Sequence, residues 1–211
     1  MAVKLLLQVS SKKCGICIRL EFATNRFIKG SMMFLQKATL LDLQKAQNEH
    51  DVEYHPDIIA LGTIGRLKHM ALHNAKYAAR FYAASAESDQ TLFTNTLTDS
   101  FIIGLSTANT LTQNLGKKIE GEHNIASEGS NSGEFTFKYL QIVGRMAKAC
   151  ESIDHLEDYP FRPEISKANV SLVTLLLNEA LARNFDLVKA YADRIADVEK
   201  HSGFAIFASD R

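Results

Sequence analysis

Proline placement constrains the fold of this 211-residue chain more than any other feature. Three prolines occur, at positions 56, 160 and 163, so residues 57–159 contain none. Apolar residues recur there at i, i+3 and i+4, and alternating patterns are scarce after residue 34. Because proline disrupts helix interiors and this spacing gives a helix one apolar face, the sequence predicts an all-α fold.

We expect a helical bundle of about six helices in a single domain over residues 34–211. The hydrophobic fraction of 46% is sufficient for one globular core. Residues 116–133 are rich in glycine, serine and charge, which predicts a flexible loop that is either a lid or a plain connector. The expected helices span residues 36–51, 58–85, 88–115, 134–158, 164–183 and 185–201.

Residues 1–33 differ from the rest and are expected to form an N-terminal arm, strand-like or disordered, with Met32 or Met33 as an alternative start. The arm is basic, and its apolar stretch is too short and interrupted for a secretory signal. Cys14 and Cys17 have CxxC spacing without a second ligand pair, so we interpret them as a chance or redox-silent pair. Cys150 fits a small core residue, and three cysteines without a signal peptide favour a cytoplasmic location.

The charge balance excludes some partners. The chain has 24 basic and 24 acidic side chains, which argues against an extended nucleic-acid surface. No apolar run approaches the roughly 20 residues that span a bilayer, so no membrane partner is expected. A local anion site remains compatible with this composition.

Five basic residues of the second expected helix share one narrow stripe. At 100° per residue their directions span about 80°. Leu61, Ile64 and Tyr82 lie on the opposite side, and Met70 and Tyr77 project close beside the stripe. Such a helix should be mostly enclosed, so we expect the stripe to line a groove or interface that suits an anion. The basic stripe, as we call it, consists of Arg66, His69, His73, Lys76 and Arg80.

The third expected helix is the natural partner of the basic stripe. Asp99 is the one charged residue between Gln90 and Gly116. Buried polar groups need partners, so Asp99 should lie opposite His69, His73 or Arg80, either as a structural ion pair or in a pocket for a phosphate-bearing ligand. The polar seam of this helix comprises Asn95, Asp99, Ser106, Asn109 and Gln113.

An acidic cluster lies near the end of the fourth expected helix. Glu151, Asp154 and Asp158 have i, i+3, i+7 spacing, which helical carboxylates use to hold Mg²⁺ or Mn²⁺. Acids at a helix C-terminus are unfavourable unless a cation compensates. The alternative is a solvated face or a salt-bridge network with Arg145, Lys148 and Arg162.

Several enzyme motifs are missing from the sequence. His69 and His73 have the spacing of a zinc-binding pair, but Met70 stands where an HExxH motif has glutamate, which excludes a metalloprotease. There is also no P-loop, GxSxG elbow or GxGxxG turn.

The layout resembles the all-α NTP pyrophosphohydrolases of the MazG type over residues 34–116. Residues 43–50 (LQKAQNEH) look like the opening helix of that family, residues 67–79 resemble its EExxE helix, and residues 97–105 (LTDSFIIGL) look like its ExxD helix. The resemblance implies a MazG-like core with additional C-terminal helices, and hydrolysis of a nucleoside triphosphate by carboxylate-bound Mg²⁺.

The acids of that family are largely missing here. Residues 69–73 (HMALH) align with EExxE, and in the second motif Asp99 matches while Thr96 stands at the glutamate position. Glu151 and Asp154 form an ExxD pair that could supply acids if their helix folds beside the second one. Two hypotheses follow: a divergent MazG-like nucleotide-binding protein with phosphates on the basic stripe, or a helical assembly protein whose polar stripes meet across a homodimer.

Overall fold

The computed structural model describes residues 37–122 and 131–201. The chain divides into two units, residues 1–33 and residues 34–211, and all described residues belong to the second. The expected N-terminal arm, with Cys14 and Cys17, therefore lies outside the described residues. Every regular element within the described ranges is a helix, which confirms the all-α prediction.

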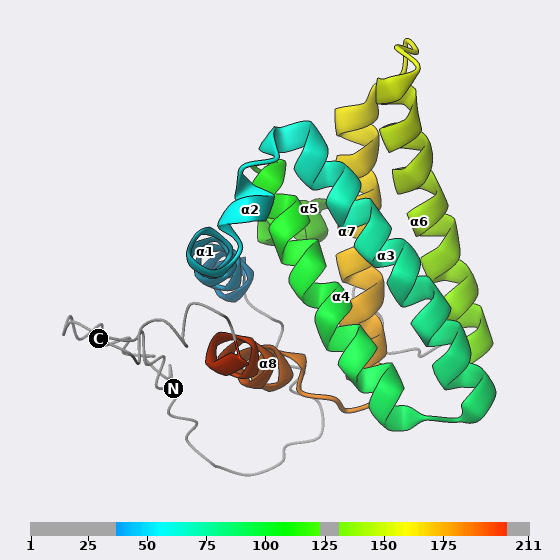
Figure 1. The fold of residues 1–211 in the computed structure, drawn as a ribbon. Helices are drawn as coiled ribbons and strands as arrows, with labels where there is room; N and C mark the ends of the chain where they lie inside the picture. Colours follow the sequence, from blue (N-terminus) through cyan, green and yellow to red (C-terminus); the bar gives the residue numbers. More distant parts are fainter. Residues whose placement is uncertain (1–36, 123–130, 202–211) are drawn as a thin grey trace, which may run out of the picture. The chain divides into compact units, whose positions relative to one another are not determined.

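Eight helices occupy the described ranges (Figure 1). In chain order they are α1 (Lys37–Tyr54), α2 (Pro56–Ile59), α3 (Gly62–Glu87), α4 (Gln90–Thr110), α5 (Leu115–Glu122), α6 (Ser132–Asp154), α7 (Phe161–Ala182) and α8 (Leu187–His201).

Two predicted boundaries need correction. The helix expected over 58–85 is divided into α2 and α3, because the chain turns at Gly62, whose φ of +67° favours glycine. The loop expected over 116–133 begins with α5, which is anchored by the buried side chains of Leu115 and Ile119. Residues 123–130 of that loop lie outside the described residues.

Four long helices enclose the main core. α3 packs on α4, α4 on α7, α7 on α6, and α6 back on α3, so the four form a closed ring of contacts (Figure 1). One end of this core is aromatic: the ring of Phe81 lies 4.9 Å from those of Phe135 and Tyr139 and 5.1 Å from that of Phe93, measured between centroids. The edge-to-face arrangement of these rings adds to the stabilisation from apolar burial.

A buried hydrogen-bond network crosses the same core. The Tyr139 hydroxyl bonds the Ser100 hydroxyl on α4 and donates to Asn74 Oδ1 on α3 at 2.9 Å. All three side chains are fully buried, and burial raises the pKa of Tyr139. The network thus ties α3, α4 and α6 together with directional bonds.

Two of the remaining helices, α1 and α8, pack beside α4. α1 contacts α4 and α5, and α8 contacts α4. His50 of α1 lies 3.3 Å from Glu199 of α8, and the Tyr191 ring of α8 meets that of Phe101 of α4 edge-on at 6.3 Å. α1 and α8 therefore border the α4 surface that carries the polar seam.

Within the described ranges, no helix combines the length and apolar character that crossing a bilayer requires.

Candidate functional site

The basic stripe runs along the edge of the core, not along a fully enclosed helix. The core side of α3 carries buried Met70, Tyr77 and Phe81, as their position beside the stripe suggested. Leu61 and Tyr82, on the side opposite the stripe, are 51% and 69% exposed, so the expectation that apolar packing surrounds α3 is wrong. The physical reason is that the four-helix ring covers only one side of α3. Within the stripe, Arg66, His69 and His73 are partly buried, and Lys76 and Arg80 are exposed.

The two histidines of the stripe form a hydrogen-bonded pair. Their Nε2 atoms lie 3.0 Å apart, and His73 Nδ1 lies 3.2 Å from Lys76 Nζ and 3.3 Å from the Tyr77 hydroxyl. Because an ammonium group only donates, His73 Nδ1 accepts from Lys76. Neutral His73 then carries its proton on Nε2 and donates it to His69 Nε2.

His73 is held in the neutral form. Burial, followed by the positive charge of Lys76 and then His69, lowers the pKa of His73 to about 4, against the opposing influence of Asp99. The permanent positive charges of the stripe are therefore Arg66, Lys76 and Arg80. His73 is a group that an arriving anion would help to protonate.

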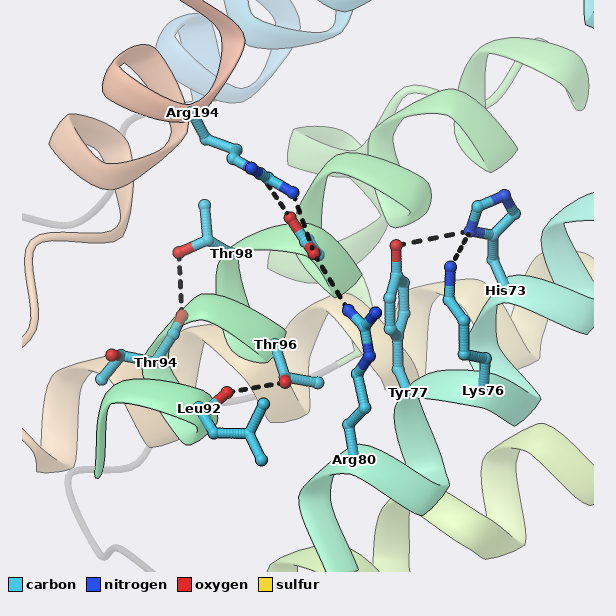
Figure 2. Close-up of polar contacts among 10 residues, drawn as sticks. His73, Lys76, Tyr77, Arg80, Leu92, Thr94, Thr96, Thr98 and Arg194 are labelled. Carbon is cyan, nitrogen blue, oxygen red and sulfur yellow. Dashed lines mark hydrogen bonds and ion pairs between the residues drawn. The ribbon is translucent and has the colours of Figure 1, made fainter. Parts of the chain in front are cut away.

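Asp99 forms ion pairs with two arginines from different helices. Arg80 Nη1 of α3 lies 3.5 Å from Asp99 Oδ2, and Arg194 Nε of α8 donates to Asp99 Oδ1 at 2.8 Å. Figure 2 shows Arg80 and Arg194 reaching toward the same point on α4. The expected pairing of Asp99 with Arg80 is thus present, whereas sequence reasoning missed Arg194, which lies 95 positions away.

Arg66 is the residue of the stripe whose guanidinium group has buried nitrogens without hydrogen-bond partners among the described residues. Its Nε and Nη2 atoms are sealed from solvent and have no hydrogen-bond partner within the described part of the chain. Buried guanidinium nitrogens without an acceptor are destabilising. The two unpaired nitrogens of Arg66 are therefore suited to bind an anion.

Two further residues of the polar seam bond α1, and the side chain of Gln113 bonds α7. Asn109 Nδ2 donates to the Gln44 carbonyl at 2.7 Å, and Ser106 Oγ donates to Asp51 Oδ2 at 2.7 Å. Asn95, at the other end of the seam, is exposed. Apart from Asp99, the seam serves helix packing and does not extend the basic stripe.

Asp51 is a buried carboxylate that sequence reasoning missed. It is 7% exposed and also accepts from Gln47 Nε2 at 2.7 Å. Gln44, Gln47 and Asp51 have i, i+3, i+7 spacing on α1, which could have revealed a polar face turned inward. The same polar spacing is typical of a solvent-exposed helix face, so it is only a weak indication that these residues are buried.

The acidic cluster does not gather into one site. α6 ends at Asp154, so Asp158 lies beyond the helix and the i, i+7 geometry fails. Lys148 pairs with Glu151 at 3.3 Å, and Lys68 pairs with Asp154. In residues 37–122 and 131–201, no group of three or more histidine, cysteine or acidic side chains is arranged to hold a metal. These three carboxylates therefore lack the shared helical face that the sequence predicted, and a metal-binding role for them stays a prediction.

α6 does lie beside α3, as an ExxD contribution to the second helix would require. The contact through Asp154 is made to Lys68, however, which projects about 120° away from the centre of the basic stripe at 100° per residue. The acidic cluster and the basic stripe are thus on different sides of α3. Cys150 in the same stretch is a buried core residue, as expected, and burial raises the pKa of its thiol.

Comparisons of this chain with protein-family models, with curated proteins and with solved structures find no match.

Proposed function

We propose that this protein binds a phosphate-bearing small molecule along the basic stripe, with a nucleoside triphosphate as the first candidate. The observation that supports it most directly is Arg66, whose two sealed guanidinium nitrogens have no acceptor in the described residues. Phosphate oxygens are strong acceptors for such a group, and arginine binds them with two parallel hydrogen bonds.

Further positive charge lies along the basic stripe beyond Arg66. Lys76 and Arg80 lie on the same side of α3, and Arg194 joins them from α8, against the single carboxylate of Asp99. The group carries a surplus of positive charge beside a partly buried surface, where electrostatic attraction is stronger than in open water. Neutral His73 adds a side chain that gains a proton as negative charge approaches.

The proposal concerns binding. The resemblance to the MazG type adds the substrate class, but the positions of its EExxE acids are occupied by residues 69–73 (HMALH). Mg²⁺ prefers hard oxygen ligands, which the stripe does not offer. If Mg²⁺ takes part, it comes with the bound nucleotide.

The first test is a ligand-induced rise in melting temperature. Pyrophosphate, GTP and the dNTPs, each with and without Mg²⁺, are compared for the wild type, Arg66→Met and Lys117→Met. Ligand at about 100 times its Kd should add about 2.7 kcal/mol of stability, a shift of a few degrees. Lys117 is an exposed lysine on α5 outside the stripe, so its variant should behave like the wild type.

Arg66→Met gives this test a second readout. Methionine keeps the apolar stem and removes the unpaired charge, so the ligand-free variant should be about 1 kcal/mol more stable than the wild type while losing the ligand-induced shift. Proton uptake on binding near pH 5.5, measured calorimetrically in buffers of different ionisation enthalpy, should reveal His73. An absence of any shift across the whole panel would refute the proposal.

A further inference from the structure

A groove lies between α6 and α7, away from the basic stripe, and its lining combines apolar side chains with cations and polar groups. The groove has a volume of about 810 Å³ and is lined by the outward faces of the two helices. α6 contributes Lys138, Arg145 and Lys148, and α7 contributes Thr174 and Asn178. No acidic side chain of the described residues lines it.

The cations of the groove form an extended row. Positions 138, 145 and 148 span about 15 Å along α6 at 1.5 Å per residue. Lys138 pairs with Glu134, and Lys148 pairs with Glu151 and Glu157, at the margins of the groove. Arg145 is exposed and has no ion pair within the described part of the chain. An extended acidic partner can contact all three cations along this row.

Thr174 is unusual among the helical hydroxyl residues of this protein. It is 7% exposed, yet its Oγ1 is sealed from solvent and has no hydrogen-bond partner among the described residues. Most buried helical threonines here instead donate to the carbonyl four residues before them, as Thr107 and Thr136 do. The Thr174 hydroxyl is therefore an unused donor that is buried behind the surface of the groove.

Asn178 complements Thr174 one turn later. Its Oδ1 is also sealed from solvent and unpartnered in the described ranges. The wall of the groove thus holds a buried, unused hydroxyl donor and a buried, unused amide acceptor about 6 Å apart along α7, the rise of four helical residues. Buried polar atoms without partners are costly, so a ligand that supplies both bonds is favoured.

We infer that this groove binds an acidic peptide segment in an extended conformation. An extended chain presents backbone carbonyls and N–H groups about every 6.6 Å, which suits both Thr174 and Asn178. Its carboxylates meet Arg145 and the two lysines. A helical partner has already used its backbone groups internally, and a phosphate dianion has no N–H to donate to Asn178.

The backbone of α6 leaves room for such a chain. Gly144 lines the groove, and a Cβ built there meets nothing within 4 Å. A peptide can therefore approach the helix closely at this point. The peptide reaches the buried Thr174 and Asn178 atoms when side chains of the groove lining move aside, which is part of the inference.

The test is fluorescence anisotropy with a labelled Glu-Val-Glu-Val-Glu-Val-Glu peptide and the full chain. We expect saturable binding that weakens as salt is raised. Arg145→Gln should weaken binding about tenfold, and Thr174→Val about threefold or more. The valine variant removes only an unpartnered hydroxyl, so it should fold like the wild type, which circular dichroism verifies.

Matched controls separate the groove from general charge effects. Lys117→Gln removes an exposed cation elsewhere, and Thr136→Val removes a hydroxyl that bonds the Ser132 carbonyl; neither should change binding of the peptide. A peptide N-methylated at alternate residues keeps its charge but loses N–H donors, and should bind more weakly. The failure of this inference is distinguishable from that of the nucleotide proposal, because Arg66→Met should leave peptide binding unchanged.

The inference is overturned if the acidic peptide shows no saturable binding up to millimolar protein. It is also overturned if Arg145→Gln and Lys117→Gln bind equally well, or if a helix-stabilised acidic peptide or pyrophosphate competes better than the extended peptide.

Discussion

At the scale of single residues, two helical glycines lie in opposite surroundings, one in a close helix contact and one facing open space. Gly104 on α4 lies against α7, where a Cβ would come within 2.8 Å of Val173 Cγ2 and where the Gly104 carbonyl accepts from Asn169 Nδ2. Gly144 on α6 faces open space. The same residue type therefore serves helix contact at one position and access to a groove at the other.

This contrast predicts opposite effects of two identical substitutions. Gly104→Ala should destabilise the protein by about 1–3 kcal/mol, because the added methyl group forces α4 and α7 apart. Gly144→Ala should stabilise it by about 0.5–1 kcal/mol through helix propensity alone. Urea unfolding of both variants measures the difference, and equal effects of the same sign would contradict this account of the α4–α7 contact.

At the scale of elements, α1 is attached by side-chain hydrogen bonds as much as by apolar contact. Gln44 is 4% exposed; its Nε2 donates to the Gln113 carbonyl at 2.6 Å, and its Oε1 accepts from the Leu115 backbone N–H at 3.1 Å. One side chain thus satisfies backbone groups on both sides of the turn that joins α4 to α5. α1 and α5 are positioned together by this contact.

Replacing this side chain tests that coupling. Gln44→Met has similar length but leaves one buried carbonyl and one buried N–H unpaired, which should cost about 2 kcal/mol. The exposed Gln141→Met provides the control for side-chain chemistry and should change little. Hydrogen exchange should show that the loss of amide protection is concentrated at Leu115 and the start of α5. Unchanged protection there would argue against the role given to Gln44.

At the scale of the whole molecule, the histidine pair links stability to pH. The folded state holds the pKa of His73 at about 4, below the ordinary value of 6.5 expected in the unfolded chain. As pH falls below 6.5, the unfolded chain takes up a proton that the folded protein resists until about pH 4. His73 therefore adds stability above pH 6.5 that is lost as pH falls toward 4.

Unfolding measurements at pH 4.5, 5.5, 6.5 and 7.5 check this sign. His73→Gln should show a shallower decline over this window than the wild type, by about 1 kcal/mol after allowance for solvent screening of a half-buried group. Lys76→Met, which removes the second cause of the shift, should raise the pKa of His73 observed by NMR titration. Parallel pH profiles for wild type and His73→Gln would overturn this link.

Much of the helical layout follows from the local sequence pattern. Where the layout departs from that pattern, the physical cause is clear. The break at Pro56 and the long helices α3, α4, α6 and α7 agree with the expected ranges within a few residues, apart from the shorter ends of α4 and α6. α5 was missed because its two apolar anchors stand among glycines and lysines. The homodimer, the cytoplasmic location and the role of Mg²⁺ stay predictions.

The sequence by itself determined that the chain is helical, where most helices lie, and that Arg66 to Arg80 share one stripe, because these features depend on spacings of three and four residues. Only the tertiary structure decided which side of α3 is buried, that Arg194 reaches Asp99, and that Asp154 pairs with Lys68 away from the stripe. The same holds for the groove between α6 and α7, whose walls come from two helices. Such contacts join residues distant in sequence, and periodicity contains no information about which helix lies beside which.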